Sequence, residues 1–476
     1  MTRKPAIRAV FDYFERMSST MRVYNNVALK RRFSLFTLIT FAFLWSLTPA
    51  LSAPVLAHYS GALSRPTKHM PLLGLMRSQP PTYTDCQKAG FLCYSPQEMR
   101  TAYSLTPLIN QGITGSGQTI VIIDSYGSPT AWQDLQTFDR DYGLPDPPSF
   151  SQLAPYGSVP FNPNNQDQVG WAEETSLDIQ WSHAVAPGAN ILVLTTPVSE
   201  TEGVQGLPQF LQLEQYALAH NYKIFSQSWA ATENTLFTPA GYRVLNAFNS
   251  FYMQAVLGHH ATFFASAGDS GSANVDANGK VYPFPTVGFP ASSPWVTSVG
   301  GTSLYADING NYQRETVWND GSNDATGGGV SQYFRIPAYQ SAALPGSDLA
   351  LLKGYRGVPD IASNADPNTG VPVYLGFLAQ GKNGYYVFGG TSESSPTWAG
   401  LLADASQYAG HPISLLNTKL YKLGQNPSVR AQVYHDVTVG NNNQPPIPGY
   451  SATVGWDPVT GWGSPIASQL FTALAH

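Results

Sequence analysis

One serine and three carboxylic acids carry the chemistry that this sequence suggests. Ser392 stands in the run YYVFGGTSESSPTWAG, just after an aromatic stretch and two glycines. Glu174 and Asp178 stand four apart in WAEETSLDIQW, and Asp269 lies in the glycine-flanked turn of FFASAGDSGS. A nucleophile, a proton acceptor and a hydrogen-bond donor to an oxyanion are the groups that acyl transfer requires. These residue types predict acyl-transfer chemistry if the fold brings them together.

The stretch around Ser392 predicts a strand, a sharp turn and then a helix. Residues 385–388 are aromatic and β-branched, which favours a buried strand. Pro396 suits the first turn of the following helix, where its missing N–H costs nothing. Ser392 would lie near the helix N-terminus, whose free N–H groups favour developing negative charge. The alternative for Ser392 is an N-cap, and we expect Ser394 or Ser395 to cap the helix if Ser392 is the nucleophile.

The pair Glu174 and Asp178 predicts a shared proton. Residues four apart lie on one face of a helix, where like charges weaken an isolated helix. Two carboxylates that close can hold one proton between them, so Glu174 could act as a base that Asp178 orients. The alternative is a solvated helix face. Glu173 is the local competitor, but its spacing from Asp178 fits a shared face less well.

Asp269 and the histidines decide what kind of base is expected. Aspartate is common in turns, but a protonated aspartate in a partly dry site can donate a hydrogen bond to an oxyanion. The usual base for a serine is histidine, yet no histidine here has a catalytic sequence context. We expect structural roles for His183, His259, His260 and His435.

Apolar strand patterns alternate with helical patterns along the chain. This alternation predicts an α/β fold with a mostly parallel central sheet and helices on both faces. Strands are expected at 119–124, 190–195, 223–228 and 262–265, and helices at 171–182, 208–220 and 238–258. Functional groups in such sheets collect beyond the carboxyl ends of strands. Four residues end or follow a predicted strand and should therefore share one cleft: Asp124, Ser228, Asp269 and Ser392.

The composition is poor in charge, and the charge is unevenly placed. Charged residues make up 12% of the 476-residue chain, which is a weak indication of acid tolerance or simply of a polar secreted surface. The first 32 residues hold eight Lys/Arg and two Asp/Glu. The remainder, with 17 basic and 28 acidic residues, has a formal net charge of −11. An acidic body argues against nucleic acid as a partner.

The basic start and the apolar run at 33–48 predict an export signal that occupies residues 1–57. Cleavage is expected after Ala53 or Ala57. The alternative is an uncleaved anchor, but the run is shorter than the roughly 20 residues that a spanning helix needs. We therefore expect a secreted protein with no membrane association once the signal is removed.

Residues 58–95 are rich in Pro, Ser and Thr, which predicts a linker. Cys86 and Cys93 are the only cysteines, and in an exported chain a close pair predicts a disulfide loop rather than a metal site.

The motifs taken in order resemble those of the sedolisin family, the serine-carboxyl peptidases with a subtilisin-like fold. The resemblance covers about residues 94–476 and rests on YSPQEMRTAY, AVAPGANI, SQSWA, SAGDSG, GGGVS, GGTSESSP and GWDPVTGWGSP. It implies a peptidase domain over 96–476 that acts on peptide or protein substrates as a monomer. It implies Ser392 as the nucleophile, Glu174 as the general base, Asp178 as its partner and Asp269 as the oxyanion-stabilising acid.

The resemblance also implies one structural Ca²⁺ in a C-terminal loop region. Hard oxygen ligands suit this ion. By motif they would be the carboxylates of Asp436 and Asp457 and the backbone oxygens of Val437, Thr453 and Gly455. The family often has glycine where Thr453 stands. The alternative is two ordinary turn aspartates.

The segment SQSWA resembles the part of the family that lines the substrate cleft. Ser228 and Trp229 would face the peptide, although Trp229 is equally suited to the core. The family commonly has a long N-terminal prodomain, whereas only the segment from about His58 to Cys93 stands between the predicted signal and the catalytic region.

The residue types are consistent with work in acid. Histidine, with a pKa of about 6.5, is protonated there, whereas a glutamate with a pKa of about 4.3 can still accept a proton. Two alternatives stay open: a catalytically silent exported peptide-binding protein on the same fold, and a His-dependent subtilisin-type protease that uses Asp124.

Overall fold

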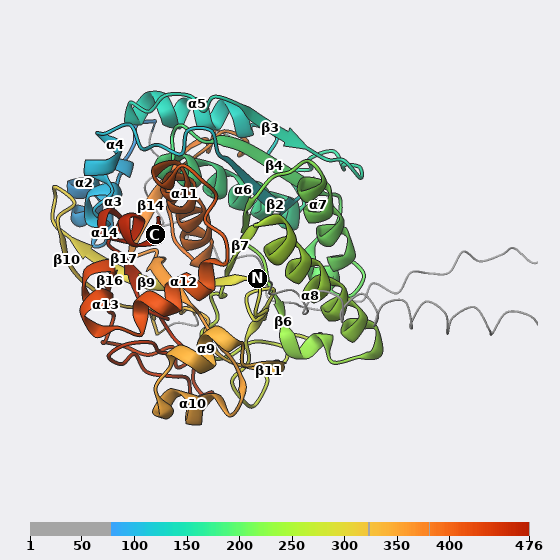
Figure 1. The fold of residues 1–476 in the computed structure, drawn as a ribbon. Helices are drawn as coiled ribbons and strands as arrows, with labels where there is room; N and C mark the ends of the chain where they lie inside the picture. The colour runs from blue at the N-terminus through green and yellow to red at the C-terminus, as the bar shows by residue number, and fades with distance from the viewer. Residues whose placement is uncertain (1–77, 322–323, 380, 476) are drawn as a thin grey trace, which may run out of the picture. The chain divides into compact units, whose positions relative to one another are not determined.

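A mostly parallel eight-stranded sheet forms the centre of the domain in the computed structural model, which describes residues 78–321, 324–379 and 381–475. The strand order is β10-β9-β7-β5-β2-β4-β3, and β13 also pairs with β9 (Figure 1). Only β10 runs antiparallel to its neighbour. The strands are β2 (Thr119–Ser125), β3 (Phe150–Leu153), β4 (Asn190–Thr196), β5 (Ile224–Gln227), β7 (Thr262–Ser266), β9 (Thr297–Ala306), β10 (Tyr312–Val317) and β13 (Ile361–Asn364). The predicted signal at 1–57 lies outside the described residues.

Helices cover both faces of this sheet, which confirms the predicted fold class. Side chains alternate along β2, so Ile120 and Ile122 pack in one hydrophobic cluster and Val121 and Ile123 in another. The first cluster includes side chains of α5 (Ala131–Tyr142), α6 (Gln166–Val185), α11 (Thr391–Ala409), α12 (Leu416–Gly424) and α14 (Ala467–Leu474). The second includes α7 (Leu207–Ala219) and α8 (Pro239–His259), which lie side by side in Figure 1.

Shorter elements complete the domain. Near the start of the domain lie α3 (Pro96–Ala102) and α4 (Thr106–Ile109). The others are β6 (Ala231–Thr232), β8 (Gly288–Phe289), β11 (Gly329–Arg335), β12 (Tyr355–Val358), β16 (Tyr434–His435), β17 (Ser464–Pro465), α9 (Ala338–Ala343), α10 (Gly346–Leu352), α13 (Pro427–Val433), and the 3₁₀ turns Glu200–Glu202 and Glu233–Leu236.

The described part of the expected linker is ordered structure rather than a linker. Thr82 forms a capping box with Asp85 at the start of α2 (Tyr83–Ala89). The strand β1 (Leu92–Cys93) adds to a second sheet, in which it pairs with β14 (Thr369–Leu375), and β14 pairs with β15 (Gly384–Phe388). Cys86 and Cys93 form the predicted disulfide between α2 and β1. The disulfide packs against Val387 of β15, the strand that leads to Ser392. The Pro-rich and Ser-rich composition did not reveal this because two short elements need their partner strand to be stable.

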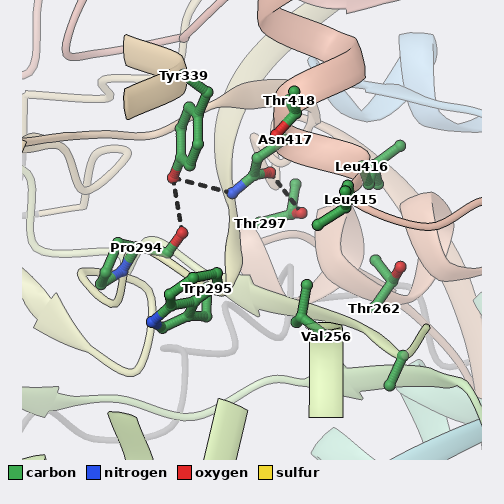
Figure 2. A pocket seen from close by; sticks show the side chains of 11 residues that line it. Val256, Thr262, Pro294, Trp295, Thr297, Tyr339, Leu415, Leu416, Asn417 and Thr418 are labelled. Carbon is green, nitrogen blue, oxygen red and sulfur yellow. Dashed lines mark hydrogen bonds between the residues drawn. The ribbon is translucent and has the colours of Figure 1, made fainter. Parts of the chain in front are cut away.

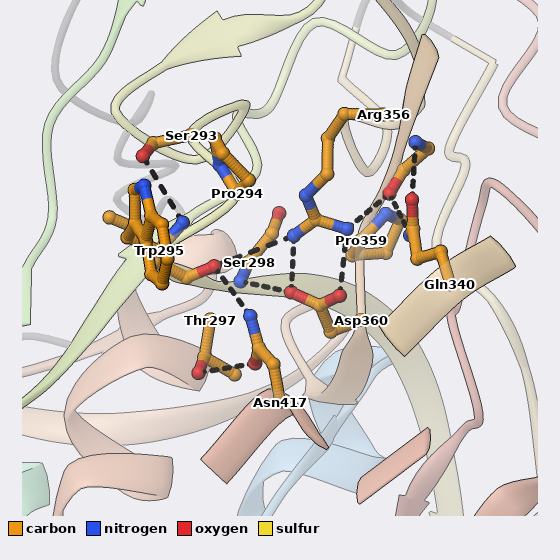
Figure 3. A network of polar contacts seen from close by, with 12 residues as sticks. Ser293, Pro294, Trp295, Thr297, Ser298, Gln340, Arg356, Pro359, Asp360 and Asn417 are labelled. Atoms are coloured by element: carbon orange, nitrogen blue, oxygen red, sulfur yellow. Dashed lines mark hydrogen bonds and ion pairs between the residues drawn. The ribbon is translucent and has the colours of Figure 1, made fainter. Parts of the chain in front are cut away.

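A buried ion pair holds the end of the sheet beside β9. Arg356 donates from both terminal nitrogens to Asp360, at 2.8 and 2.6 Å (Figure 3). The same carboxylate accepts from the backbone N–H of Ser298 and from the Tyr421 hydroxyl, at 2.8 and 2.9 Å. Because every oxygen of Asp360 is bonded, the charge is buried without an unpaired acceptor.

Among the described residues, no helix is both long enough and apolar enough to cross a membrane.

The disulfide predicts a measurable loss of stability on reduction. It closes a loop of a few residues, and loop-closure entropy assigns about 2 kcal/mol to a loop of that size. We expect the double variant Cys86→Ser/Cys93→Ser, or reductant added to the native protein, to lower the melting temperature in calorimetry. The double variant itself is the control, since it has no thiol left and reductant should not destabilise it further. An unchanged melting temperature after complete reduction would contradict this expectation.

Candidate active site

Ser392 lies at a sharp turn between β15 (Gly384–Phe388) and α11. The helix begins at Thr391, and its N-cap is Gly390, whose φ of 106° is a backbone conformation that favours glycine. Ser392 is therefore the second residue of the helix and is buried. The predicted strand, turn and helix are all present.

The expectation that Ser394 or Ser395 caps α11 is wrong, because both lie inside the helix. The Ser394 hydroxyl donates to the carbonyl oxygens of Ser363 and Asn364 at the end of β13, at 3.1 and 2.9 Å. The Ser395 hydroxyl is 3.0 Å from that of Ser226. Both serines thus fasten the nucleophile-bearing turn to the sheet beneath it.

Pro396 also lies deeper in α11 than predicted, inside the helix rather than in its first turn. A proline has no N–H, so it cannot donate to the carbonyl of the residue four positions earlier, which is Ser392. The Ser228 hydroxyl lies 3.4 Å from that carbonyl oxygen. The same hydroxyl donates to Asp178 Oδ1 at 2.8 Å. Ser228 therefore bridges the backbone of Ser392 and the carboxyl pair, at the carbonyl to which Pro396 cannot donate.

The carboxyl pair is buried, and the solvated-face alternative is wrong. Glu174 and Asp178 on α6 are both 0% exposed, because α6 packs directly along α11. A Cβ on Gly400 of α11 would lie 2.8 Å from the Cβ of Val185, so glycine permits this close approach. Burial, followed by the charges of Asp124 and Glu174, raises the pKa of Asp178 well above its ordinary value.

Asp124 joins this pair as a third buried acid. It stands in β2, near its carboxyl end, and burial raises its pKa to about 7. The charge of Asp124 helps to raise the pKa of Asp178, so a carboxyl group of α6 lies near Asp124. A His-dependent protease that used Asp124 would need an imidazole there instead. The sequence signal for its position was an acid at the end of an apolar strand.

Asp269 lies on the other side of the Ser392 turn. Its Oδ1 accepts hydrogen bonds from the backbone N–H and the hydroxyl of Thr391, at 2.9 and 2.7 Å. Oδ2 has no hydrogen-bond partner among the described residues. Burial raises the pKa of Asp269 to about 7 against the lowering effect of the Thr391 bonds. Below that pH the group is a neutral acid whose proton is available to donate.

Sequence reasoning missed Thr391, which positions Asp269 beside the nucleophile. Its hydroxyl accepts from the Gly268 N–H at 3.0 Å, and its carbonyl accepts from the Ser266 hydroxyl at 2.9 Å. Its place directly before Ser392 was the only available signal. The structure therefore brings Ser392, Asp178 and Asp269 to one place, at the carboxyl ends of the strands.

The histidines considered from sequence are engaged elsewhere. His183 is buried 3.2 Å from Asp139 and 2.8 Å from the carbonyl oxygen of Pro145. The ring of His435 stacks on Tyr312. His259 ends α8, and His260 is its C-cap in the left-handed conformation. These positions suit structural roles.

Trp229 occupies the core position that the sequence left open. Its side chain is 1% exposed and packs against Phe210 and Phe248, with ring centroids 4.6 and 6.2 Å away. Ser228, its neighbour, is bonded to Asp178 as described above. Within the segment that was predicted to line the cleft, Ser228 thus bonds the acid pair and Trp229 packs in the core.

A small pocket of about 40 Å³ lies at the opposite, amino-terminal end of the strands (Figure 2). Thr262 begins β7 and Thr297 begins β9, and both line it together with Tyr339 and Asn417. Ser392 and the acids gather at the carboxyl ends, so this pocket is separate from the candidate active site.

The residues of the predicted calcium site share one loop. The Gly455 N–H donates to both oxygens of Asp436, at 2.9 and 3.2 Å, and the Thr453 N–H donates to Asp457 Oδ2 at 2.9 Å. Asp457 and Val437 are buried. Arg430 Nε lies 3.4 Å from Asp436 Oδ2.

These residues fit a hard cation even though no cluster of three or more acidic, histidine or cysteine side chains is found among the described residues. Asp457 forms no ion pair with a described cationic side chain, and burial raises its pKa to about 7. A buried carboxylate of this kind is stabilised by a cation, and two carboxylates with backbone oxygens are ligands that Ca²⁺ accepts.

The chain is similar to known peptidases. The profile of the subtilase family matches residues 157–444. Kumamolisin from Bacillus sp. (strain MN-32) is 35% identical over 432 residues, which cover 90% of this chain and 72% of kumamolisin. Human tripeptidyl-peptidase 1 is 28% identical over 449 residues, which cover 86% and 70% of the two chains.

A solved structure is also similar. The structure of Pseudomonas sedolisin, a serine-carboxyl proteinase complexed with two molecules of pseudo-iodotyrostatin, aligns with a TM-score of 0.66 at 30% identity. The alignment covers 80% of this chain and 98% of that one. In sequence, sedolisin from Pseudomonas sp. (strain 101) is 31% identical over 383 residues, and this chain covers 59% of it.

The buried acids predict that the protein loses stability as the pH rises from acid. The pKa values of Asp124 and Asp269 are about 7 when folded, whereas an unfolded aspartate has a pKa of about 3.8. The folded state thus holds these protons more tightly. The stabilisation is complete below about pH 4 and is lost towards pH 7, at up to about 1.4 kcal/mol per group for each pH unit.

We expect the melting temperature in calorimetry to fall between about pH 4 and about pH 7. Asp124→Asn removes one titrating group and should flatten the decline. A melting temperature that rises over this range would contradict the assignment of raised pKa values to these acids.

Proposed function

The chain belongs to the sedolisin family of serine-type peptidases, and from that premise we propose that it is a secreted, acid-active serine-carboxyl peptidase. It hydrolyses peptide bonds through an acyl-enzyme on Ser392. The observation that carries the proposal is the position of the Ser392 turn between two buried acidic groups, with Asp178 reached through Ser228 and Asp269 through Thr391.

In the first half of the reaction, Ser392 Oγ attacks the peptide carbonyl while Glu174 accepts its proton. Asp178 orients Glu174, and Ser228 holds Asp178. The tetrahedral oxyanion accepts a hydrogen bond from protonated Asp269 and lies near the N-terminus of α11, whose N–H groups favour negative charge. Glu174 then returns the proton to the leaving amine, and the acyl-enzyme forms.

In the second half, a water molecule attacks the acyl-enzyme while Glu174 accepts a proton from it. The ester bond to Ser392 breaks, and the proton passes to Oγ. A neutral Asp269 is required in both halves. Since its pKa is about 7, burial keeps the oxyanion donor protonated throughout the acidic range.

The substrates are peptides or proteins, and we propose endopeptidase action. Ser228 and Trp229 belong to the cleft segment, with Ser228 acting on the acid pair and Trp229 supporting the segment from the core. The predicted signal at 1–57 supports secretion into the extracellular space. The protein acts as a monomer.

We further propose one structural Ca²⁺ in the loop region near the C-terminus. Asp436 and Asp457 would provide carboxylates, and Val437, Thr453 and Gly455 would provide backbone oxygens. The carboxylate of Asp457 supports this assignment, because it is buried and forms no ion pair with a cationic side chain among the described residues. The ion would hold the loop to the domain rather than take part in the reaction.

The catalytic roles are tested by substitution. Ser392→Ala should lower kcat by at least about 10³-fold in acid, and Glu174→Gln should do the same, because a triad-like unit fails when either part is lost. Asp269→Asn should lower kcat by about 10²- to 10³-fold with little change in KM, as expected for an oxyanion donor. The measurement is peptide hydrolysis at about pH 4 and across a pH series.

The matched control is Ser406→Ala, which removes another buried hydroxyl of α11 about four turns away from Ser392 and should retain most of the activity. If Ser392→Ala is fully active, the nucleophile is wrongly assigned. If the pure protein binds peptide but does not cleave it at any pH, it is a catalytically silent peptide-binding protein. A rate maximum near neutral pH would favour the His-dependent alternative.

The calcium proposal predicts a thermal effect of chelation. A ligand present at about 100 times its Kd stabilises the folded state by about 2.7 kcal/mol. We expect exhaustive chelation to lower the melting temperature by a few degrees and added Ca²⁺ to restore it. Asp457→Asn should melt at a lower temperature and lose its response to Ca²⁺. Equal melting curves with and without chelator would argue against the site.

A further inference from the structure

Glu393, the residue directly after Ser392, has a buried carboxyl group that the reaction does not use. It lies in the first turn of α11 and is 1% exposed. Its Oε1 accepts a hydrogen bond from Asn364 Nδ2 at 3.0 Å. Its Oε2 has no hydrogen-bond partner among the described residues.

Asn364 is held rigidly, so it gives Glu393 a fixed partner. It ends β13, and its Oδ1 accepts from the Leu304 N–H at 3.0 Å and from the Thr369 hydroxyl at 2.8 Å. Its Nδ2 also donates to the Thr369 carbonyl at 2.7 Å, and its backbone N–H donates to the Tyr103 hydroxyl at 2.7 Å. With its side-chain donors and acceptors used, Asn364 anchors the first turn of α11 to the sheet through Glu393.

The groups that face this carboxyl are acidic or neutral. Asp366, in the loop after β13, opposes a charge on Glu393, and the Tyr103 hydroxyl feels that charge in turn. Three further acidic groups are bonded to residues around this turn. Glu315 on β10 accepts from Tyr103, Asp269 accepts from Thr391, and Asp178 on α6 accepts from Ser228. No ion pair among the described residues includes Glu393.

The buried cation of α3 does not compensate Glu393. Arg100 of α3 is buried and interacts with Asp404, which lies about three turns further along α11. An ionised Glu393 would therefore be a buried charge without a cation, which is costly. Burial, opposed by the Asn364 bond and reinforced by Asp366, accordingly raises the pKa of Glu393 well above its ordinary value.

We propose that Glu393 is a positioning residue that acts only while uncharged: as a carboxylic acid it docks the first turn of α11 onto Asn364 and so places Ser392 and Thr391. Ionisation would drive the side chain out of this site and shift the turn. Asp269 would move as well, because Thr391 holds it. This inference rests on the proposed role of Ser392. It adds a second acidic requirement to the reaction, located beside the nucleophile rather than in the acid pair.

The test compares Glu393→Ala and Glu393→Gln with a matched control, Glu214→Gln. Glu214 on α7 is equally buried and has a raised pKa for the same reason, but it contacts Tyr252 in the other hydrophobic cluster. For each protein, kcat and KM are measured from about pH 3 to pH 8, and unfolding is followed by calorimetry over the same range.

We expect Glu393→Ala to lower kcat in acid by about tenfold or more, as a displaced catalytic turn does, and Glu393→Gln to restore it. The glutamine is isosteric and cannot ionise. Its kcat should therefore persist to higher pH, with a ratio of kcat near pH 6.5 to kcat near pH 4 at least about threefold above the native ratio. Glu214→Gln should flatten the pH dependence of stability without changing the kcat profile.

Two results would overturn the proposal. If Glu393→Gln has the native kcat profile and differs only in stability, as Glu214→Gln does, Glu393 is a packing residue. If glutamine is as inactive as alanine, the neutral acid is not what positions the turn. Ser392→Ala tests the proposed function separately. If that variant keeps full activity, Ser392 is not the nucleophile and the proposed function fails, whatever Glu393→Gln shows.

Discussion

The close packing of α6 against α11 is the constraint on which the site depends. Gly400 lets the backbones approach until a Cβ there would meet Val185 at 2.8 Å and the Ser182 carbonyl at 3.0 Å. At that separation no water layer fits between the helices. Glu174 and Asp178 are therefore buried against the helix that carries Ser392 in its first turn. A larger residue at position 400 would separate the acid pair from the serine that it serves.

Burial of acids without matching cations gives the protein its expected relation to pH. In water these carboxyl groups would be ionised at neutral pH, but in the core they favour the protonated form. Burial raises the pKa of Glu200 to about 8 and those of Asp124 and Asp269 to about 7. An acidic medium keeps such groups neutral, so the condition that stabilises the fold also keeps Asp269, the proposed oxyanion donor, protonated. Stability and catalysis then share one physical cause.

The segment from Thr391 to Pro396 connects the two sides of the site. Thr391 holds Asp269 on one side, and the missing N–H of Pro396 leaves the Ser392 carbonyl facing Ser228, which bonds Asp178 on the other. Ser394 and Ser395 fasten the same turn to β13 and β5. The nucleophile is thus positioned by its own neighbours in sequence, each bonded to a different strand or loop of the sheet.

Local patterns in the sequence predicted the main elements and the candidate reacting groups. Continuous apolar runs predicted β2 and β4, helical spacing predicted α6 and α11, and the strand-glycine-serine pattern singled out Ser392, because these signals depend only on neighbours along the chain. The packing of distant elements was needed to show that Gly390 rather than Ser394 caps α11, that Trp229 packs in the core and that β1 joins a sheet. It also showed that Thr391 and Glu393 are bonded to other elements of the fold. Each of these depends on contacts between different elements of the fold, or on the water that such contacts exclude, and no local pattern encodes either.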